Sequence, residues 1–353
     1  MNHILQRRRL LAASAAGLLL PASAWAQTSK PTRPSAAAGG KPFQIYGITF
    51  RGSTEVERGF EEYFASRKVP VQITWRDLNR DPNRMPAFLT EIRQTKPDLI
   101  YTWGTSVTLG VVGPYDAADH SPFIQNIPVV FTLVAAPVLA KIVPQLANTG
   151  RNVTGVTHVA PTEAQVNAMG QYRPLQTLGV LYTPTERNSV VILEELRRLA
   201  RERNFKLLER PFRLDANNKP SAEGASELVR ELKAAGAQWL YLPPDSFLGT
   251  LAEGVIIPTA MEESLPTFAS TEQLMQAGAL TGLVSRYFSL GQYTAHKVEQ
   301  ILVGKQAPSS IAVDTLKRFS YQISMAAAKR LKLPPPMNML NFAELINTGT
   351  PGS

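Results

Sequence analysis

The segment LIYTWGTSVTLG, residues 99–110, contains the first side chains that could do chemistry. Its apolar start predicts a strand, and Gly104, Thr105 and Ser106 form a turn before residues that could continue as a helix. Such a turn directs backbone N–H groups and hydroxyls toward the space above a sheet edge. The segment could therefore be a phosphate loop, a catalytic nucleophile or a cradle for a small ligand.

Sequence motifs do not favour the first two of these. The chain contains no G-x-x-x-x-G-K-[ST], no G-x-G-x-x-G and no G-x-S-x-G motif. No two of its four histidines have metal-ligand spacing. His158 follows a predicted strand and is either a ligand contact or a solvent-facing loop residue. Asp245-Ser246 could be an acid and a nucleophile, but we favour Asp245 as a helix N-cap that also faces the site. We expect no metal, cofactor or catalytic residue.

Composition sets the class of protein. The 353 residues suffice for two lobes, and 44% hydrophobic with 18% charged residues is typical of a globular protein. The absence of cysteine excludes disulfides. The net charge of +9 falls to +6 without residues 1–26, which carry three arginines and no acid. No basic tract with interleaved aromatic residues occurs, so a nucleic-acid partner is not expected.

The N-terminus has the pattern of an export signal. Arg7-Arg8-Arg9 precedes an apolar stretch that ends at Ala24-Trp25-Ala26, which predicts a signal peptide over residues 1–26 and a periplasmic product. The arginines also fit a twin-arginine signal, with an ordinary Sec signal as the alternative. Residues 27–42 predict a flexible linker, and residues 348–353 a tail.

From residue 43 onward, strand and helix patterns alternate, and the alternation occurs twice. We predict strands at 43–50, 69–75, 98–103, 127–134 and 152–159, with helices at 56–67 and 85–95. The order then repeats, with strands at 177–184, 205–212 and 237–244 and helices at 188–204 and 221–236. Two successive βαβαβ runs predict an α/β protein with two doubly wound parallel-sheet lobes joined by a hinge.

The remaining elements predict how the chain divides between the lobes. A strand at 278–285, a helix at 290–304, a strand at 309–315 and a helix at 324–333 exceed what the second lobe needs. They fit if the chain crosses back to the first lobe before it ends in the second. We therefore assign residues 43–157 plus 286–308 to the N-terminal lobe, and 158–285 plus 309–347 to the C-terminal lobe.

Candidate ligand-binding residues follow from the predicted strand ends, because ligands of open parallel sheets lie beyond the carboxyl ends of the strands. If the two edges face each other, the candidates in one cleft are Arg51, Ser53, Gly104, Thr105, Ser106, Thr132, Ala136, Thr157, His158, Glu186, Asn188, Ser189, Asp245, Ser246, Thr271, Arg286 and Tyr287. Glu186 and Asn188-Ser189 could equally cap the long helix that follows them, or contact a ligand through the positive end of that helix.

Taken together, these segments resemble those of ABC-transporter substrate-binding proteins of the tryptophan/tyrosine-binding type. The matching motifs occur in family order: G-T-S (104–106), V-F-T-L-V-x-x-P (130–137), N-V-T-G-V (152–156), L-Y-T-P-T-E-R-N-S (181–189), L-P-P-D-S (242–246), G-A-L (278–280) and Y-F-S-L-G (287–291). The resemblance implies a type I periplasmic-binding fold, ligand capture by hinge closure and docking on a permease of the inner membrane. It also implies that Gly104-Thr105-Ser106 cradles a ligand carboxylate.

Three departures from the family pattern affect the expected ligand. Where the family commonly has acidic residues, or Asp or Asn, this chain has Ala136, His158 and Arg286. Acidic residues in a cleft pair with a ligand ammonium group, so an anionic ligand without an amine is our hypothesis. Arg286 would pair with its carboxylate, His158 would contribute when protonated, and Trp103 and Tyr287 could form an aromatic wall.

We therefore predict a monomeric periplasmic binding protein for a small, carboxylate-bearing solute, either an organic or aromatic acid or an amino acid. A ligand-sensing module for a membrane receptor shares this fold and is the first alternative. A periplasmic hydrolase that uses Asp245 or His158 is the second, although the sequence offers no convincing base beside a nucleophile.

Overall fold

The first sheet explains how the N-terminal half positions its strand ends. The computed structural model describes residues 41–346, so the predicted signal peptide, most of the linker and the tail lie outside the described residues. The sheet is entirely parallel in the order β2-β1-β3-β4-β5, and its members are β1 (Phe43–Thr49), β2 (Val71–Asp77), β3 (Leu99–Trp103), β4 (Val129–Thr132) and β5 (Val153–Gly155). The strand order reverses between β1 and β3, which is the switch point of a doubly wound sheet.

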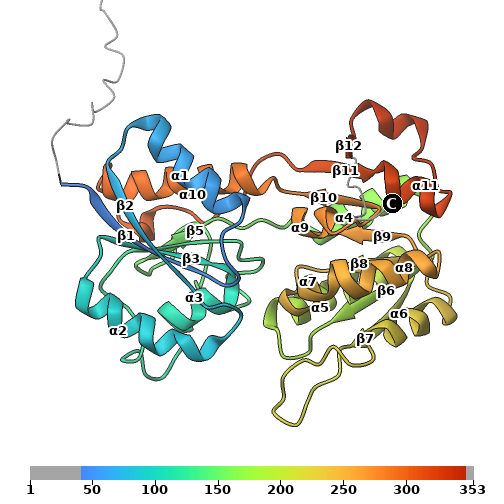
Figure 1. Cartoon of the computed structure of the whole chain (residues 1–353), viewed down its shortest axis with the longest axis horizontal. Coiled ribbons are helices and arrows are strands. Elements are labelled where there is room, and N and C mark those ends of the chain that lie inside the picture. Colours follow the sequence, from blue (N-terminus) through green and yellow to red (C-terminus); the bar gives the residue numbers. More distant parts are fainter. Residues whose placement is uncertain (1–40, 347–353) are drawn as a thin grey trace, which may run out of the picture. The chain divides into compact units, whose positions relative to one another are not determined.

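Helices cover both faces of this sheet (Figure 1). The helices of this half are α1 (Glu55–Arg67), α2 (Met85–Thr95), α3 (Gly104–Val112) and α10 (Tyr287–Leu302). Ile45 and Tyr101 pack in one buried cluster with residues of α1 and α10. Tyr46 and Ile100, one position away on the same strands, pack in a second cluster with residues of α2 and α3. Side chains that alternate between two buried faces are expected of a parallel sheet covered on both sides.

The second sheet repeats the first and extends it. Its order is β12-β11-β10-β9-β8-β6-β7, and its members are β6 (Thr177–Tyr182), β7 (Lys206–Pro211), β8 (Trp239–Leu242), β9 (Thr267–Ala269), β10 (Thr281–Val284), β11 (Ser320–Ser324) and β12 (Glu344–Ile346). Strands β7-β6-β8-β9-β10 have the same relative order as the first sheet, with the switch point between β6 and β8. β11 runs antiparallel to β10, and every other pair is parallel.

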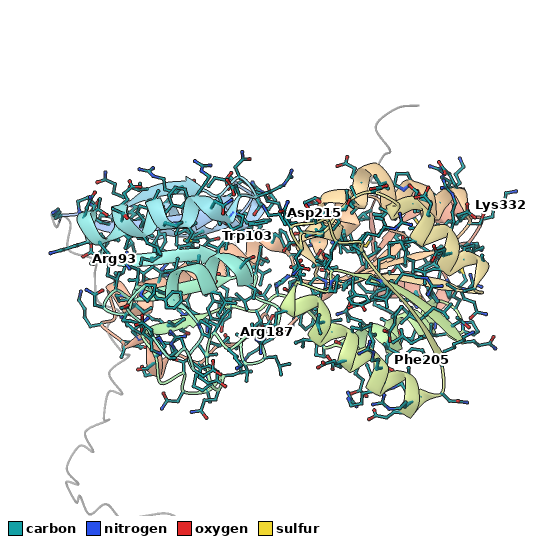
Figure 2. The ribbon with its side chains drawn as sticks, turned by 90° about the horizontal axis from the view of Figure 1, so that it is seen from below. Arg93, Trp103, Arg187, Phe205, Asp215 and Lys332 are labelled. Atoms are coloured by element: carbon teal, nitrogen blue, oxygen red, sulfur yellow. The ribbon has the colours of Figure 1, made fainter. Side chains whose placement is uncertain are left out.

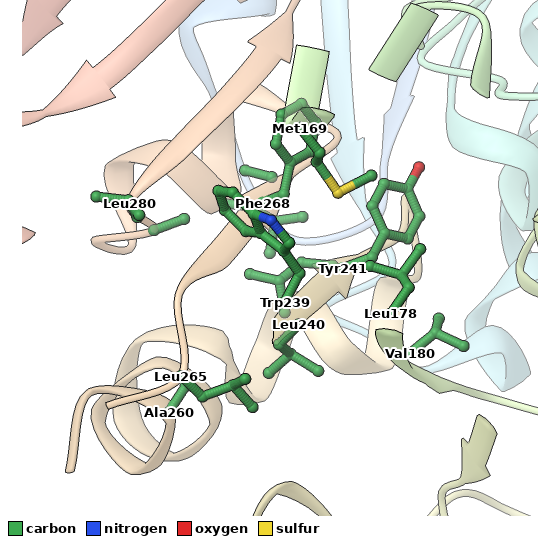
Figure 3. Packing of buried hydrophobic residues seen from close by; sticks show 14 of the residues in the cluster. Met169, Leu178, Val180, Trp239, Leu240, Tyr241, Ala260, Leu265, Phe268 and Leu280 are labelled. Carbon is green, nitrogen blue, oxygen red and sulfur yellow. The ribbon is translucent and has the colours of Figure 1, made fainter. Parts of the chain in front are cut away.

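A single large core supports the second sheet. Trp239, Tyr241 and Phe268 are fully buried beside Met169 (Figure 3). The helices around this sheet are α4 (Thr162–Tyr172), α5 (Arg187–Arg203), α6 (Ala225–Ala234), α7 (Ser246–Leu251), α8 (Ile257–Glu262), α9 (Glu272–Gln276) and α11 (Met325–Leu331). The predicted fold class, two doubly wound parallel-sheet lobes, is confirmed. In residues 41–346 no helix is both long and apolar enough to cross a membrane.

Helix α10 packs against the helices of the first sheet although it follows the second sheet in the chain. It follows β10 of the second sheet, yet it packs on α1 at a very close approach. A Cβ atom added at Gly291 would lie 1.9 Å from the Val56 carbonyl oxygen, and one added at Gly59 would lie 2.1 Å from the Phe288 carbonyl oxygen. Only glycine allows the two backbones to approach this closely.

One predicted element is wrong. Residues 309–315 do not form a strand; they begin inside a 3₁₀ turn at Pro308–Ser310 and make a single bridge between Asp314 and Val156. The Thr154 hydroxyl also donates to the Ile311 carbonyl oxygen at 2.7 Å. These contacts favour placing residues 308–314 beside β5 of the first sheet. The lobe boundaries themselves stay a prediction.

The close approach of α1 and α10 predicts a stability effect. Gly59→Ala and Gly291→Ala should each lower the free energy of unfolding by about 1–3 kcal/mol, because the added methyl group meets backbone oxygen. Gly170→Ala is the matched control: it lies inside α4, and its added Cβ would have nothing within 4 Å. That control should be neutral or stabilising by up to about 1 kcal/mol. Urea unfolding measures all three, and equal effects would contradict the packing argument.

Candidate functional site

The strand ends at both switch points contribute to one pocket. The described residues all belong to one compact unit of the chain. Residues after β1, β3 and β4 line the pocket together with residues after β6, β8 and β9. The full lining is Arg51, Trp103, Gly104, Thr105, Ser106, Leu133, His158, Glu186, Asn188, Pro243, Pro244, Asp245, Ser246, Gly249, Thr271, Gln273, Leu274 and Tyr287. The expectation that the two sets of strand ends share one cavity therefore agrees with the structure.

The start of α3 presents free backbone donors to the pocket. Trp103 is the N-cap residue of α3 and makes no capping hydrogen bond through its side chain. Gly104 has a φ of +81°, a conformation that glycine adopts without strain, and it turns the chain sharply from β3 into the helix. The N-terminus of a helix carries a partial positive charge. Gly104, Thr105 and Ser106 thus form an electropositive edge that suits a carboxylate.

Arg51 supplies a full positive charge beside that edge. Its guanidinium lies over the Trp103 indole, 5.0 Å from the ring centroid, and donates to the side-chain oxygen of Gln273 on α9. Burial lowers the pKa of Arg51, yet an arginine remains charged at neutral pH. No salt bridge joins Arg51 to an acidic residue within the described part of the chain. The guanidinium is therefore half-buried and lacks a carboxylate partner.

Asp245 is held entirely by protein donors. Its carboxylate accepts hydrogen bonds from Thr183 N (2.7 Å), Thr183 Oγ1 (2.9 Å), Ser189 Oγ (2.6 Å) and Leu248 N (2.8 Å). The last of these makes it the N-cap of α7, as the sequence predicted. Because all its bonds tie β6, α5 and α7 together, its main role in this site is to position neighbouring residues.

Glu186 is the second acid of the pocket. Its carboxylate accepts the backbone N–H of Ser246 at 2.8 Å and the Ser246 hydroxyl at 2.7 Å. Burial, and next the charge of Asp245, raise the pKa of Glu186 to about 7. Such a carboxyl group is partly protonated near neutral pH, and it releases its proton when it pairs with a cation.

His158 does not carry the charge that the sequence suggested. The side chain is 6% exposed, and its ring lies edge-on to Tyr287 with centroids 6.5 Å apart. Burial, and then the charge of Arg51, lower its pKa to about 3. The expectation that a protonated His158 attracts an anion is therefore wrong near neutral pH. Its Nδ1 atom and the Trp103 Nε1 atom are both buried and have no hydrogen-bond partner in the described part of the chain.

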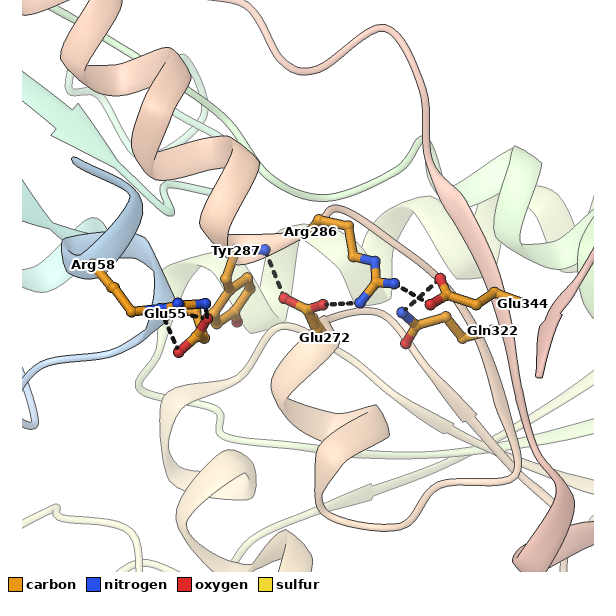
Figure 4. Close-up of polar contacts among 7 residues, drawn as sticks. All are labelled: Glu55, Arg58, Glu272, Arg286, Tyr287, Gln322 and Glu344. Carbon is orange, nitrogen blue, oxygen red and sulfur yellow. Dashed lines mark hydrogen bonds and ion pairs between the residues drawn. The ribbon is translucent and has the colours of Figure 1, made fainter. Parts of the chain in front are cut away.

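Arg286 also departs from its expected role. It does not line the pocket, because its guanidinium binds Glu272 Oε1 at 3.1 Å and Glu344 (Figure 4). The predicted pairing of Arg286 with a ligand carboxylate has no geometric support, whereas the guanidinium of Arg51 belongs to a residue that lines the pocket.

The other candidates divide clearly. Gly104, Thr105, Ser106, Asn188, Ser246, Thr271 and Tyr287 line the pocket together with Arg51, His158, Glu186 and Asp245. Five more candidates, apart from Arg286, are not in the lining. Ser53 lines a neighbouring pocket, and Thr132 is buried against Thr294. The Thr157 backbone N–H donates to Asp314, Ser189 donates to Asp245, and Ala136 has no place in the lining. Which lining residues touch a ligand stays a prediction.

The candidates taken from the sequence did not include six other lining residues, which are Leu133, Pro243, Pro244, Gly249, Gln273 and Leu274. Gln273 lies in α9, which has only five residues and therefore shows no helical periodicity. The candidate Thr271, two residues earlier in the chain, was the one signal that pointed toward it. In residues 41–346, His, Asp and Glu side chains do not gather in a group that could hold a metal ion.

The two sheets and the shared pocket define a two-lobed ligand-binding protein of the type I periplasmic-binding fold. The family model for "ABC transporter substrate binding protein" matches residues 58–345, so the chain belongs to this family. This confirms the resemblance found in the sequence.

Comparisons with individual proteins agree. The tyrosine-binding protein of Clostridioides difficile is 24% identical over 264 residues, which cover 74% of this chain and 71% of that protein. A conserved domain protein from Vibrio cholerae has a TM-score of 0.75 at 24% identity, over 86% of this chain and 99% of the other. An ABC domain from Streptococcus pneumonia, solved in complex with L-Trp, has a TM-score of 0.71 at 20% identity, over 85% and 99%.

The bonding of Asp245 predicts that it is essential for folding of the site. Asp245→Ala should lower the free energy of unfolding by about 3–5 kcal/mol, because it leaves several buried donors without an acceptor. Asp81→Ala is the matched control, since Asp81 is an exposed N-cap that accepts only Asn83 N. It should cost about 1 kcal/mol. Guanidinium unfolding measures both, and similar losses would contradict the assignment.

Proposed function

We propose that this protein is the periplasmic substrate-binding component of an ABC transporter and captures an aromatic α-amino acid. The observation that carries the proposal is the pair of opposite charges in one pocket. Arg51 and the start of α3 offer positive charge without a carboxylate partner, and Glu186 offers a carboxyl group of raised pKa. A zwitterion satisfies both, and each of its two charges forms a charge-assisted hydrogen bond.

The aromatic part of the ligand is supported by the pocket wall. Trp103 and Tyr287 line it, and the buried Trp103 N–H has no acceptor among the described residues. Two relatives bind such ligands: one is named for tyrosine, and one was solved with L-Trp. In the sequence, the absence of the three family acids suggested an anionic ligand without an amine. The pocket lining nevertheless contains two other acidic residues, Glu186 and Asp245, which could pair with an ammonium group.

Capture would proceed by closure of the two lobes around the ligand. In this structure Arg51 of the first lobe donates to Gln273 of the second, and Arg187 at the start of α5 donates to the Leu139 carbonyl oxygen at 2.6 Å (Arg187 is labelled in Figure 2). A ligand that contacts both lobes favours the closed form. A complete shift of a two-state equilibrium takes about 5.5 kcal/mol of differential affinity, which several charge-assisted hydrogen bonds can supply. The closed form would then dock on the permease as a monomer.

Binding without turnover fits the site better than hydrolysis. Asp245 is saturated by donors, and His158 has a depressed pKa with no nucleophile hydrogen-bonded to it. The Glu186 carboxylate accepts hydrogen bonds from both the hydroxyl and the backbone N–H of Ser246. This is the geometry of a capped helix start rather than of a base that activates a nucleophile. Signalling to a membrane receptor shares this site, and the identity of the docking partner separates it from transport.

Ligand binding tests the proposal directly. Isothermal titration calorimetry should detect binding of L-tryptophan or L-tyrosine to the protein. Tryptamine and tyramine, which lack the carboxylate, and 3-indolepropionate and 3-(4-hydroxyphenyl)propionate, which lack the amine, should each bind at least about tenfold more weakly, the loss expected for one charged hydrogen-bonding group. Arg51→Met should weaken binding of the amino acids about 10- to 100-fold. The control Arg84→Met removes another guanidinium that lies on an aromatic ring, Phe88, outside the pocket. Amine-free acids that bind as tightly as the amino acids would contradict the zwitterion.

The raised pKa of Glu186 predicts a pH dependence. The ammonium group needs an ionised Glu186, so affinity for the amino acid should rise several-fold from pH 6 to pH 8, across the pKa of about 7. Glu186→Gln should weaken binding and flatten this profile. His158 should not contribute, because its pKa of about 3 lies below this range. A profile that keeps its slope in Glu186→Gln would assign the titration to another group.

A further inference from the structure

Arg286 lies where the chain passes from one lobe to the other. It follows Ser285 at the end of β10 in the second sheet, and the next residue, Tyr287, begins α10, which packs on α1 of the first lobe. We refer to Ser285-Arg286 as the β10–α10 crossing. Such crossings are where a two-lobed protein bends.

Arg286, within this crossing, lies between two carboxylates, those of Glu272 and Glu344 (Figure 4). Arg286 binds the carboxylate of Glu272, the first residue of α9, at 3.1 Å, and also binds Glu344 of β12. The second oxygen of Glu272 accepts the Tyr287 backbone N–H at 2.6 Å. One carboxylate of the second lobe therefore holds both the residue before α10 and the first residue of α10.

Helix capping does not explain an arginine at this position. The N-terminus of a helix is positive, so a cationic side chain beside it is unfavourable. Arg286 makes no capping hydrogen bond through its side chain, and Glu272 caps α10 from another helix instead. The Glu272 side chain is only 7% exposed, so its charge is costly unless it is paired. Arg286 provides that pairing, and Glu344 provides the second contact of the guanidinium.

The same residues connect the crossing to the pocket. Glu272 lies between Thr271 and Gln273, and both of these line the pocket. Tyr287 itself also lines the pocket, and its backbone N–H is held by Glu272. Any rotation at the crossing therefore acts on these pocket residues.

We propose that Glu272, Arg286 and Glu344 form a hinge clamp, which fixes the direction of the β10–α10 crossing and so sets the distribution of distances between the two lobes in the ligand-free protein. Arg286 and Glu272 are then positioning residues, which hold Tyr287 and the start of α9 without contacting the ligand. This inference concerns the free protein, and it stands or falls independently of which ligand the pocket takes.

Distances between the lobes test the clamp directly. The chain has no cysteine, so the variants Glu62→Cys on α1 and Arg201→Cys on α5, both exposed, allow two spin labels without a competing thiol. Double electron–electron resonance on the mature, ligand-free protein gives the distance distribution. In this background Arg286→Met should broaden the distribution and shift its mean by several ångströms, because hinge rotation is no longer restrained.

Three further variants make the test specific. Arg197→Met is the matched control, since Arg197 has a similar exposure (44% against 45%) and pairs with Glu209 inside the second lobe. It should leave the distribution unchanged. Arg286→Lys, which can reach one carboxylate but cannot bridge two, should give an intermediate distribution. Glu344→Gln should also broaden it, and this variant decides the question if circular dichroism shows that Arg286→Met does not fold. Distributions of Arg286→Met or Glu344→Gln that match the Arg197→Met control would overturn the clamp.

Discussion

The ligand site depends on one constraint of doubly wound sheets, the divergence of neighbouring crossovers at a switch point. The helices that follow β1 and β3 cover opposite faces of the first sheet, so the carboxyl ends of these two strands are left without a helix above them. The second sheet repeats the arrangement at β6 and β8. Each gap exposes backbone donors and short loops, and the residues with the chemistry of the site come from these two gaps.

Electrostatics then sets Arg51 apart from the other charged residues. Most ion pairs of the described residues involve exposed side chains and contribute little to stability. Arg51 differs, because it is half-buried and its nearest partners are an indole ring and an amide. A buried cation without an anion is unfavourable in the free protein. If the ligand carries a carboxylate, as we propose, pairing with Arg51 recovers this stabilisation, so the same desolvation that costs stability contributes to affinity.

Much of the fold could be predicted, because β-branched runs and amphipathic helices recur at regular spacing; β6, α5 and α10 are examples. The errors have physical causes. Residues 309–315 have a strand-like composition, but they make only one bridge, to Val156 just after β5. Pairing with a neighbouring strand, which composition alone does not predict, is needed to form a strand. β12 has three residues and α9 has five, too short for a periodic signal. For the site, strand ends predicted the positions of Arg51, Glu186 and Asp245, and the type of each residue indicated its possible charge.

Sequence position did not predict where a long side chain points or whether a group is charged. Arg286 and Tyr287 are adjacent, yet the tyrosine faces the pocket and the arginine faces two acids of the second lobe. Arg286 is at a position where the family often has Asp or Asn, so a comparison of residue types alone suggests a change in the ligand. The contacts indicate a different consequence, since Arg286 pairs with Glu272 and Glu344 outside the pocket, whereas Arg51 and Glu186 line it.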